Sequence, residues 1–111
     1  MKARYNVWVE AADGGVVVSR WRARLLEAID RTGSISAAAA ELKVPYRRAW
    51  EKLKEMEAHF GQGLIDTEVG GPHGGGARLT DKARDLVNRF HAFEGGLGEE
   101  IEVRYRRAFG S

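Results

Sequence analysis

The chain opens with an alternation of hydrophobic and polar residues. Residues 4–10, RYNVWVE, carry an apolar or aromatic side chain at every second position, which is the period of a β-strand. The pair Asp13-Gly14 is a strong hairpin signal, and the three valines at 16–18 are expected to form a return strand. The pattern therefore predicts an N-terminal β-hairpin, to which we assign a packing role.

After the hairpin, the hydrophobic spacing changes to every three or four residues, as is typical of helices. A helix is predicted over residues 20–32, with Ser19 as its cap and Gly33 at its end. Trp21 is interpreted as a core residue of this helix.

The middle of the chain predicts two helices joined by a tight turn. Ser34 and Ser36 can each cap a short first helix, about residues 36–42, and its four alanines combine high helix propensity with little bulk. The turn falls at Lys43-Val44. Pro45 suits the first position of the second helix, which is expected to run to about Phe60.

The second helix has one apolar and one charged face. Its apolar stripe is Ala49, Leu53, Met56 and Phe60, and we also assign Trp50 to the core. At about 100° per residue, the opposite face carries Arg47, Arg48, Glu51, Lys54 and Glu55. These features describe a helix-turn-helix over about residues 35–60, whose second helix can enter a DNA major groove. A helical hairpin with solvated arginines is the alternative.

A glycine-rich segment follows this helix. Residues 64–69 predict a strand, GGPHGGG at 70–76 a loop, and residues 77–79 a second strand. A β-hairpin directly after a recognition helix is the wing of a winged helix-turn-helix, and Arg78 and the backbone N–H groups there can reach phosphates or a minor groove. The glycines match neither GxGxxG nor GxxxxGK[ST], which argues against a nucleotide-binding loop. A loop without contacts is the alternative.

The last helical pattern covers residues 80–108, with Thr80 as its cap. Its apolar seam is Leu86, Phe90, Phe93, Leu97, Ile101 and Tyr105. Glycines at 95, 96 and 98 cost up to about 1 kcal/mol each relative to alanine, but the seam keeps its phase across them, which favours one kinked helix. A seam this long indicates a symmetric dimer through the helix. A helix folded back on its own domain is the alternative.

Composition narrows the class of protein. A chain of 111 residues predicts one domain, 1–111, mainly α with a small β component (α+β). The absence of cysteine excludes disulfides and thiolate metal sites, and the three histidines lack metal-ligand spacing. No catalytic constellation stands out, so neither an enzyme nor a cofactor is expected. There is no signal peptide and no apolar stretch long enough to cross a bilayer, so we expect a cytoplasmic protein without membrane contact.

Charge is unevenly distributed along a chain whose net charge is only +2. Residues 20–54 hold nine Lys/Arg against four acids, a local net charge of +5, whereas residues 94–102 hold four glutamates and no base. A basic region on a near-neutral protein suits a polyanion that is met at one surface, such as double-stranded DNA.

The run LLEAIDRTGSISAAAAELKVPYRRAWEKLKEM and the following FGQGLIDTEVGGPHGGGARLT resemble the N-terminal domain of molybdate-responsive (ModE-type) transcriptional regulators, which have a LysR-like winged helix-turn-helix. The match covers about residues 25–80. It is carried by Gly33-Ser34-Ile35-Ser36, by Tyr46-Arg47-Arg48-Ala49-Trp50, by the wing from Gly70 to Gly76, and by Leu79-Thr80.

This resemblance implies a dimeric, cytoplasmic transcriptional regulator that reads operators with Tyr46, Arg47 and Arg48, while a wing holding His73 and Arg78 touches the flanking backbone. Family members with a known effector bind molybdate in a separate C-terminal region. This chain stops at Ser111 and contains no such region. We therefore do not expect the resemblance to carry over binding of molybdate or another oxyanion.

Two residues of the turn depart from the family pattern. Lys43 stands where the family often has glycine, and a positive φ there costs roughly 1 kcal/mol. Pro45 replaces the more usual serine and removes a capping hydroxyl.

The function expected is that of a homodimeric, sequence-specific DNA-binding regulator. Arg47 and Arg48 are the foremost candidates for base or phosphate contacts, because a guanidinium pairs bidentately with guanine. Glu51 is assigned to cytosine or to a neighbouring cation. The lysines are assigned to phosphates. The full predicted DNA-binding set is Ser34, Ser36, Lys43, Tyr46, Arg47, Arg48, Glu51, Lys52, Lys54, His73 and Arg78.

Two alternatives use the same fold. A protein-interaction module would form a stable dimer and ignore DNA. A small oxyanion sensor would hold its anion at a helix N-terminus or in a pocket between subunits.

Overall fold

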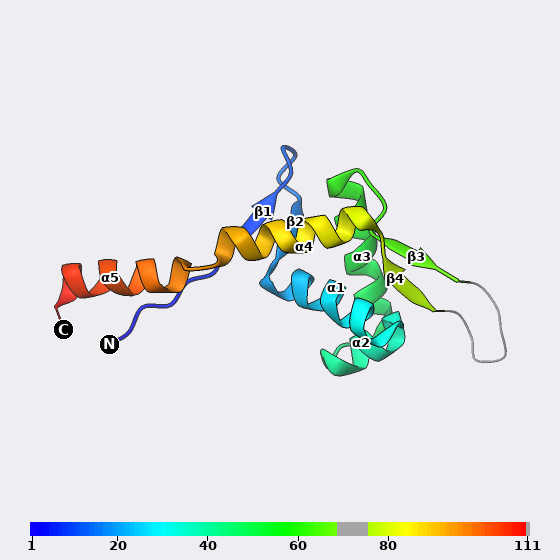
Figure 1. Ribbon diagram of the computed structural model, residues 1–111, viewed down its shortest axis with the longest axis horizontal. Coiled ribbons are helices and arrows are strands. Elements are labelled where there is room, and N and C mark those ends of the chain that lie inside the picture. Colours follow the sequence, from blue (N-terminus) through cyan, green and yellow to red (C-terminus); the bar gives the residue numbers. More distant parts are fainter. Residues whose placement is uncertain (69–75, 111) are drawn as a thin grey trace.

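The computed structural model describes residues 1–68 and 76–110 and shows a helical body with a β-hairpin at each side and a helix projecting from one end (Figure 1). Its extents are 60 × 29 × 21 Å. The elements are β1 (Trp8–Glu10), β2 (Val16–Ser19), α1 (Arg20–Thr32), α2 (Ile35–Glu41), α3 (Tyr46–Phe60), β3 (Ile65–Thr67), β4 (Ala77–Leu79), α4 (Asp81–Glu94) and α5 (Leu97–Phe109). The predicted fold class, a mainly helical winged helix-turn-helix with an N-terminal hairpin, is confirmed.

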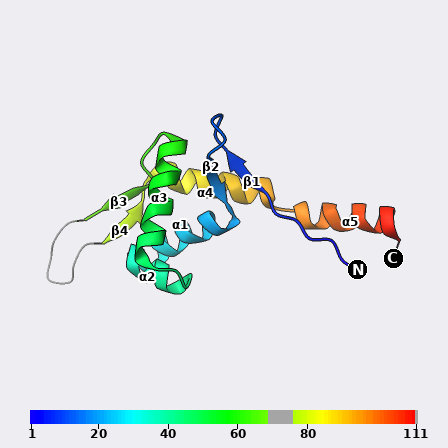
Figure 2. The ribbon, with the colours of Figure 1, turned by 180° about the vertical axis from the view of Figure 1, so that it is seen from behind.

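The N-terminal hairpin is shorter than its alternating pattern predicted. β1 pairs antiparallel with β2, with Val9 opposite Val18, and the register shifts between Val9 and Glu10. Only β2 contributes to the core, through Val17 and Val18, while all of β1 is exposed. The residues before Trp8 leave the hairpin and run beside the start of α5 in both views (Figures 1 and 2).

The hydrophobic core surrounds α1. Leu25, Leu26 and Ile29 of this helix are fully buried, and each neighbouring element adds a few apolar side chains. The alanines of α2 are what allow that helix to lie close to α1: Ala38 and Ala39 are buried. The core residues of the elements that carry the candidate site are Ile35, Ala49, Leu53, Met56, Leu64, Ala77 and Leu79. The core therefore fixes α2, α3 and the base of the β3–β4 hairpin relative to one another.

The caps of the two helix-turn-helix helices differ from the prediction. Ser34, and not Ser36, caps α2, because its hydroxyl accepts a hydrogen bond from the backbone N–H of Ala37. Ser36 lies in the first turn of α2. Pro45 is the residue before α3 and not its first residue, since its ψ of 146° is extended and the helical path begins at Tyr46.

The last helical pattern, predicted as one kinked helix, forms two separate helices, α4 and α5. α4 ends at Glu94, Gly95 has an extended ψ of 129°, and Gly96 has a φ of +81° that favours glycine. α5 then continues almost on the line of α4, as both ribbon views show (Figures 1 and 2). Gly98 lies inside α5, where the Tyr5 hydroxyl would be 3.2 Å from an added Cβ.

The break divides the predicted interface seam into two parts. Leu86 and Phe90 face the core of their own subunit, with 9% and 2% of their surface exposed, so they leave little surface for the predicted dimer interface. Beyond them the seam is accessible: Phe93 is exposed, and Leu97, Ile101 and Tyr105 are half-buried. α5 has no buried residue at all.

Candidate nucleic-acid interface

The surface of α3 presents three groups of side chains. Tyr46, Trp50 and Lys54 follow one another at four-residue spacing on the edge next to the β3–β4 hairpin. Arg47 and Glu51 occupy the adjoining, outermost stripe. Arg48 and Lys52 lie on the other side of that stripe, away from the hairpin. All of these residues except Lys52 are exposed, and the Arg47 side chain is 90% exposed.

Several charged residues of α3 form ion pairs within the helix. Arg47 Nε lies 3.5 Å from Glu51 Oε1, and Lys52 Nζ lies 3.4 Å from Glu55 Oε2. Exposed pairs of this kind contribute about 0–1 kcal/mol. A phosphate or a guanine edge can therefore replace Glu51 as the partner of Arg47 at little cost.

Trp50 was assigned to the core by sequence, and this was wrong. Trp50 is 44% exposed, whereas Ala49 is fully buried. One residue along a helix is a rotation of about 100°, so the stripe through Ala49 and Leu53 turns Trp50 toward the rim of the helix. Lys54 Nζ lies 5.3 Å from the ring centroid, in a cation–π arrangement. The missed signal was the phase of the apolar stripe itself.

The β3–β4 hairpin, the described part of the wing, has two distinct faces. Its register pairs Ile65 with Leu79 and Asp66 with Arg78. Leu79 is buried and Ile65 packs against the core, so alternation turns Arg78 to the outer face of the hairpin, where it is exposed. Arg78 is thus on the wing as predicted, but on the face away from α3. His73 lies outside the described residues.

A hollow of about 260 Å³ separates the start of α3 from the wing. It is lined by Ser34, Ile35, Ser36, Tyr46, Thr67, Glu68, Gly76 and Ala77. The structure thereby brings together three residues of the predicted DNA-binding set, namely Ser34, Ser36 and Tyr46. Because Tyr46 of the exposed edge of α3 also lines this hollow, a ligand that contacts α3 and the wing can reach these hydroxyls.

Glu57 joins α3 to the wing, a role that the sequence did not reveal. Its Oε2 accepts hydrogen bonds from the backbone N–H groups of Leu64 at 2.8 Å and Ile65 at 3.4 Å, and its Oε1 pairs with Lys54 Nζ at 3.1 Å. Burial raises the pKa of the Glu57 carboxyl group, but the hydrogen bond from the Leu64 N–H and the Lys54 ammonium lower it by more. The pKa is therefore below its ordinary value.

Further backbone bonds complete the junction. The Thr80 hydroxyl donates to the carbonyl of Gly63 at 2.8 Å and accepts from the N–H of Ala83, so one side chain caps α4 and holds the loop before β3. The N–H of Ala77 donates to the carbonyl of Gly33 at 2.9 Å, which ties β4 to the turn before α2. The position of the wing relative to α2 and α3 is therefore set by buried and hydrogen-bonded groups.

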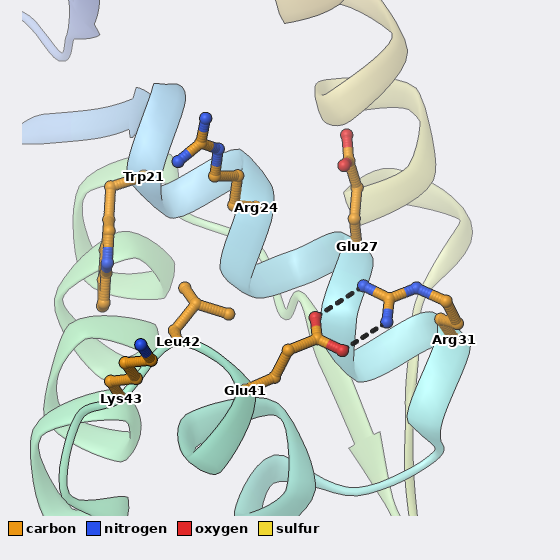
Figure 3. A pocket seen from close by; sticks show the side chains of 7 residues that line it. All are labelled: Trp21, Arg24, Glu27, Arg31, Glu41, Leu42 and Lys43. Atoms are coloured by element: carbon orange, nitrogen blue, oxygen red, sulfur yellow. Dashed lines mark hydrogen bonds and ion pairs between the residues drawn. The ribbon is translucent and has the colours of Figure 1, made fainter.

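The turn before α3 lies next to a separate pocket of about 410 Å³ (Figure 3). Lys43 has the positive φ predicted for it, 60°, and is exposed. Across the pocket, Arg31 and Glu41 form two parallel hydrogen bonds of 2.5 and 2.7 Å that hold α1 to α2. The same contact lowers the pKa of Glu41 and raises that of Arg31. Lys43 thus stands at the rim of this pocket and directly before the exposed edge of α3.

The described residues contain neither a metal-binding cluster nor a membrane-spanning helix. Within residues 1–68 and 76–110, no cluster of His, Asp or Glu could hold a metal ion. No helix in this part of the chain is long and apolar enough to cross a membrane.

The helix pair, the turn, and the wing anchored beside the second helix define a winged helix-turn-helix protein. Residues 22–84 match the family described as bacterial regulatory helix-turn-helix protein, lysR family, and the chain belongs to this family.

Two characterised relatives show which members of the family this chain is similar to. The molybdenum transport protein ModE of Azotobacter vinelandii is 40% identical over 82 residues, which are 74% of this chain and 30% of that protein. The molybdenum-pterin-binding protein MopA of Rhodobacter capsulatus is 39% identical over 82 residues, 74% of this chain and 31% of that protein. The chain thus spans about 30% of the length of these relatives. The resemblance to ModE-type regulators is confirmed.

Solved structures share the fold. The DNA-binding domain of CbnR, crystallised with DNA, matches with a TM-score of 0.57 and 20% identity over 72% of this chain and 90% of that chain. The DNA-binding domain of BenM, in complex with benA site 1 DNA, matches with a TM-score of 0.57 and 16% identity over 82% of this chain and 97% of that chain.

Proposed function

We propose that this protein is a ModE-type transcriptional regulator that binds double-stranded DNA sequence-specifically as a homodimer in the cytoplasm. The observation that carries the proposal is the exposed edge of α3. It presents Lys54 beside the base of the wing and Arg47 on the adjoining outermost stripe, while the buried face of the helix is fixed in the core. Membership of the family described as bacterial regulatory helix-turn-helix protein, and the neighbours crystallised with DNA, support the same function.

In this proposal α3 lies in the major groove with its first two turns toward the bases. Arg47 gives up its weak pair with Glu51 to bind a guanine or a phosphate. Arg48 and Lys52 contact phosphates on one side of the groove, and Ser34 and Ser36 contact phosphates on the other side, next to the wing. Lys43 adds a cation at the N-terminal end of the helix. Arg78 and His73 remain predictions for the wing.

The exposure of α5 supports the homodimer. A helix of 13 residues without a buried side chain is marginal in water, because helices of this length depend on packing for their stability. Phe93, Val103 and Phe109 expose more than half of their surface along α5 and just before it. A second copy that covers the accessible seam of Phe93, Leu97, Ile101 and Tyr105 would remove this apolar surface from water and set two α3 helices at a fixed spacing.

Binding to selected duplexes tests the DNA function. Bound sequences are selected from a random pool, and the dissociation constant is measured by fluorescence anisotropy over a salt series. Replacing Arg47 and Arg48 together by Ala removes two cations from the proposed interface. This double change should weaken specific binding by about 1–3 kcal/mol for each arginine that touches the DNA, and it should reduce the salt dependence.

Arg89→Ala is the matched control, because Arg89 forms an i,i+4 pair with Asp85 on α4 and is 79% exposed. This variant should bind like the wild type, provided that light scattering gives the same mass for both. Unchanged affinity in the Arg47 and Arg48 double variant would contradict the proposed interface. A stable dimer that shows no salt-dependent binding to any duplex would favour the protein-interaction alternative.

A further inference from the structure

An exposed tryptophan stands among the charged residues of α3. Trp50 leaves 44% of its surface in contact with water. The inner side of its ring borders a small hollow of about 70 Å³ between α3 and the wing, lined by Ile35, Trp50, Leu53, Lys54, Glu57, Ile65 and Thr67. Trp50 therefore has an apolar support behind it and an apolar surface that no described part of the subunit covers.

A chain of contacts through Lys54 orients the ring. Lys54 Nζ lies 5.3 Å from the ring centroid and is itself held by Glu57. Glu57 in turn accepts the backbone N–H of Leu64 at the start of the wing. The indole is thus connected through two side chains to the junction of α3 and β3, and its orientation is set before any ligand binds.

The place of Trp50 on α3 indicates what it meets. It lies one turn after Tyr46 and between the outermost stripe and the wing, so it faces the groove wall when the outermost stripe faces the base edges. In the major groove the base edges present hydrogen-bonding groups, and the 5-methyl group of thymine is the apolar one. A rigid ring with an apolar surface is complementary to this methyl group, which the other three bases lack.

We propose that Trp50 is a specificity-determining residue that recognises the 5-methyl group of a thymine at the edge of each half-site, while Lys54 neutralises the adjacent phosphate. This inference rests on the proposed DNA function. It adds a contact for thymine to the guanine and cytosine contacts assigned to Arg47 and Glu51.

Deoxyuridine substitution tests the contact, because it removes the methyl group and changes no hydrogen-bonding group. Each thymine of a selected duplex is replaced in turn, and the dissociation constants are measured for wild type, Trp50→Gln and Trp50→Phe. In the wild type, replacing one particular thymine per half-site should weaken binding about fourfold, the factor expected for one buried methyl group. Trp50→Phe should keep most of this effect, and Trp50→Gln should show none.

Trp8→Ala is the control for an exposed tryptophan elsewhere, since Trp8 is 47% exposed on β1. It should keep the wild-type response to deoxyuridine. A second measurement needs no variant: a duplex with 5-iododeoxyuridine at the responsive position is irradiated with the wild-type protein, and the cross-linked peptide is identified by mass spectrometry. The cross-link is expected at Trp50.

Three results would overturn the inference. They are a wild-type scan in which no deoxyuridine weakens binding, a response of equal size in Trp50→Gln, and a cross-link that falls on residues outside α3. Each of these leaves specific DNA binding intact and so leaves the proposed function standing. Failure of the wild type to retain any duplex would instead overturn both.

Discussion

Glu57 offers the sharpest test of how the wing is positioned, because a single carboxylate connects α3 to the start of β3. Its side chain is 18% exposed and accepts two backbone N–H groups while pairing with Lys54. Hydrogen bonds to a charged group contribute about 1.5–3 kcal/mol, and a buried donor left without a partner costs about 1–3 kcal/mol. Leu64, the closer donor, is fully buried.

We therefore expect Glu57→Ala to lower the free energy of unfolding by about 2–3 kcal/mol. Glu57→Gln keeps an oxygen that can accept the Leu64 N–H but removes the charge, and should cost about 1 kcal/mol. Urea-induced unfolding, followed at one fixed protein concentration because a dimer is expected, measures both.

Glu51→Ala is the matched control, since Glu51 is on the same helix and its contact is an exposed pair with Arg47. This change should stay within about 0.5 kcal/mol of the wild type. If Glu57→Ala proves no more destabilising than Glu51→Ala, the carboxylate does not anchor the wing and the reasoning is refuted.

The same contact predicts a pH dependence. The pKa of Glu57 is lowered in the folded state, so its carboxylate contributes stability that is fully present above the unfolded value of about 4.3. That contribution disappears as the pH falls through the lower, folded pKa. The difference in unfolding free energy between wild type and Glu57→Gln should therefore be constant from pH 7 to about 5 and shrink below about pH 4. A difference that grows on acidification would contradict this assignment.

Two further predictions concern the turn and the dimer. Lys43→Gly should raise the free energy of unfolding by up to about 1 kcal/mol, because glycine adopts a φ of 60° without strain, whereas Lys43→Ala should bring no gain. Urea unfolding of the two variants measures this difference, and equal stabilities would mean that the turn is not strained. Ile101→Asp should shift the protein from dimer to monomer in sedimentation experiments, because it places a charge on the accessible seam; an unchanged mass at micromolar concentration would remove this seam from the interface.

Local patterns were sufficient to predict most of the helical elements. The alanines of α2 and the stripe through Ala49, Leu53 and Met56 specify which sides pack, and Ala38, Ala39 and all three stripe residues are buried as expected. The positive φ of Lys43 was expected from the family resemblance, because glycine often stands at this position of the turn. These features depend on neighbours within a few residues along the chain, which is why the sequence reveals them.

Other features depend on how separate elements meet. Glu57 binds N–H groups seven and eight residues further on, which requires the path of the loop between α3 and β3. The break at Gly95 and Gly96 was hidden because the three- and four-residue spacing of the apolar side chains continues across it in the sequence. Leu86 and Phe90 share the seam of Ile101, and only the tertiary structure shows that the first two are used in the subunit core.

The most direct measurement of the central claim is an NMR titration of the isotope-labelled protein with a selected duplex, read at each backbone amide. The proposed interface predicts the largest shifts over Tyr46–Lys54 and in the strands Ile65–Thr67 and Ala77–Leu79, with small shifts in α5. Shifts concentrated on α5 or on the outer surface of α1, with α3 unchanged, would contradict it.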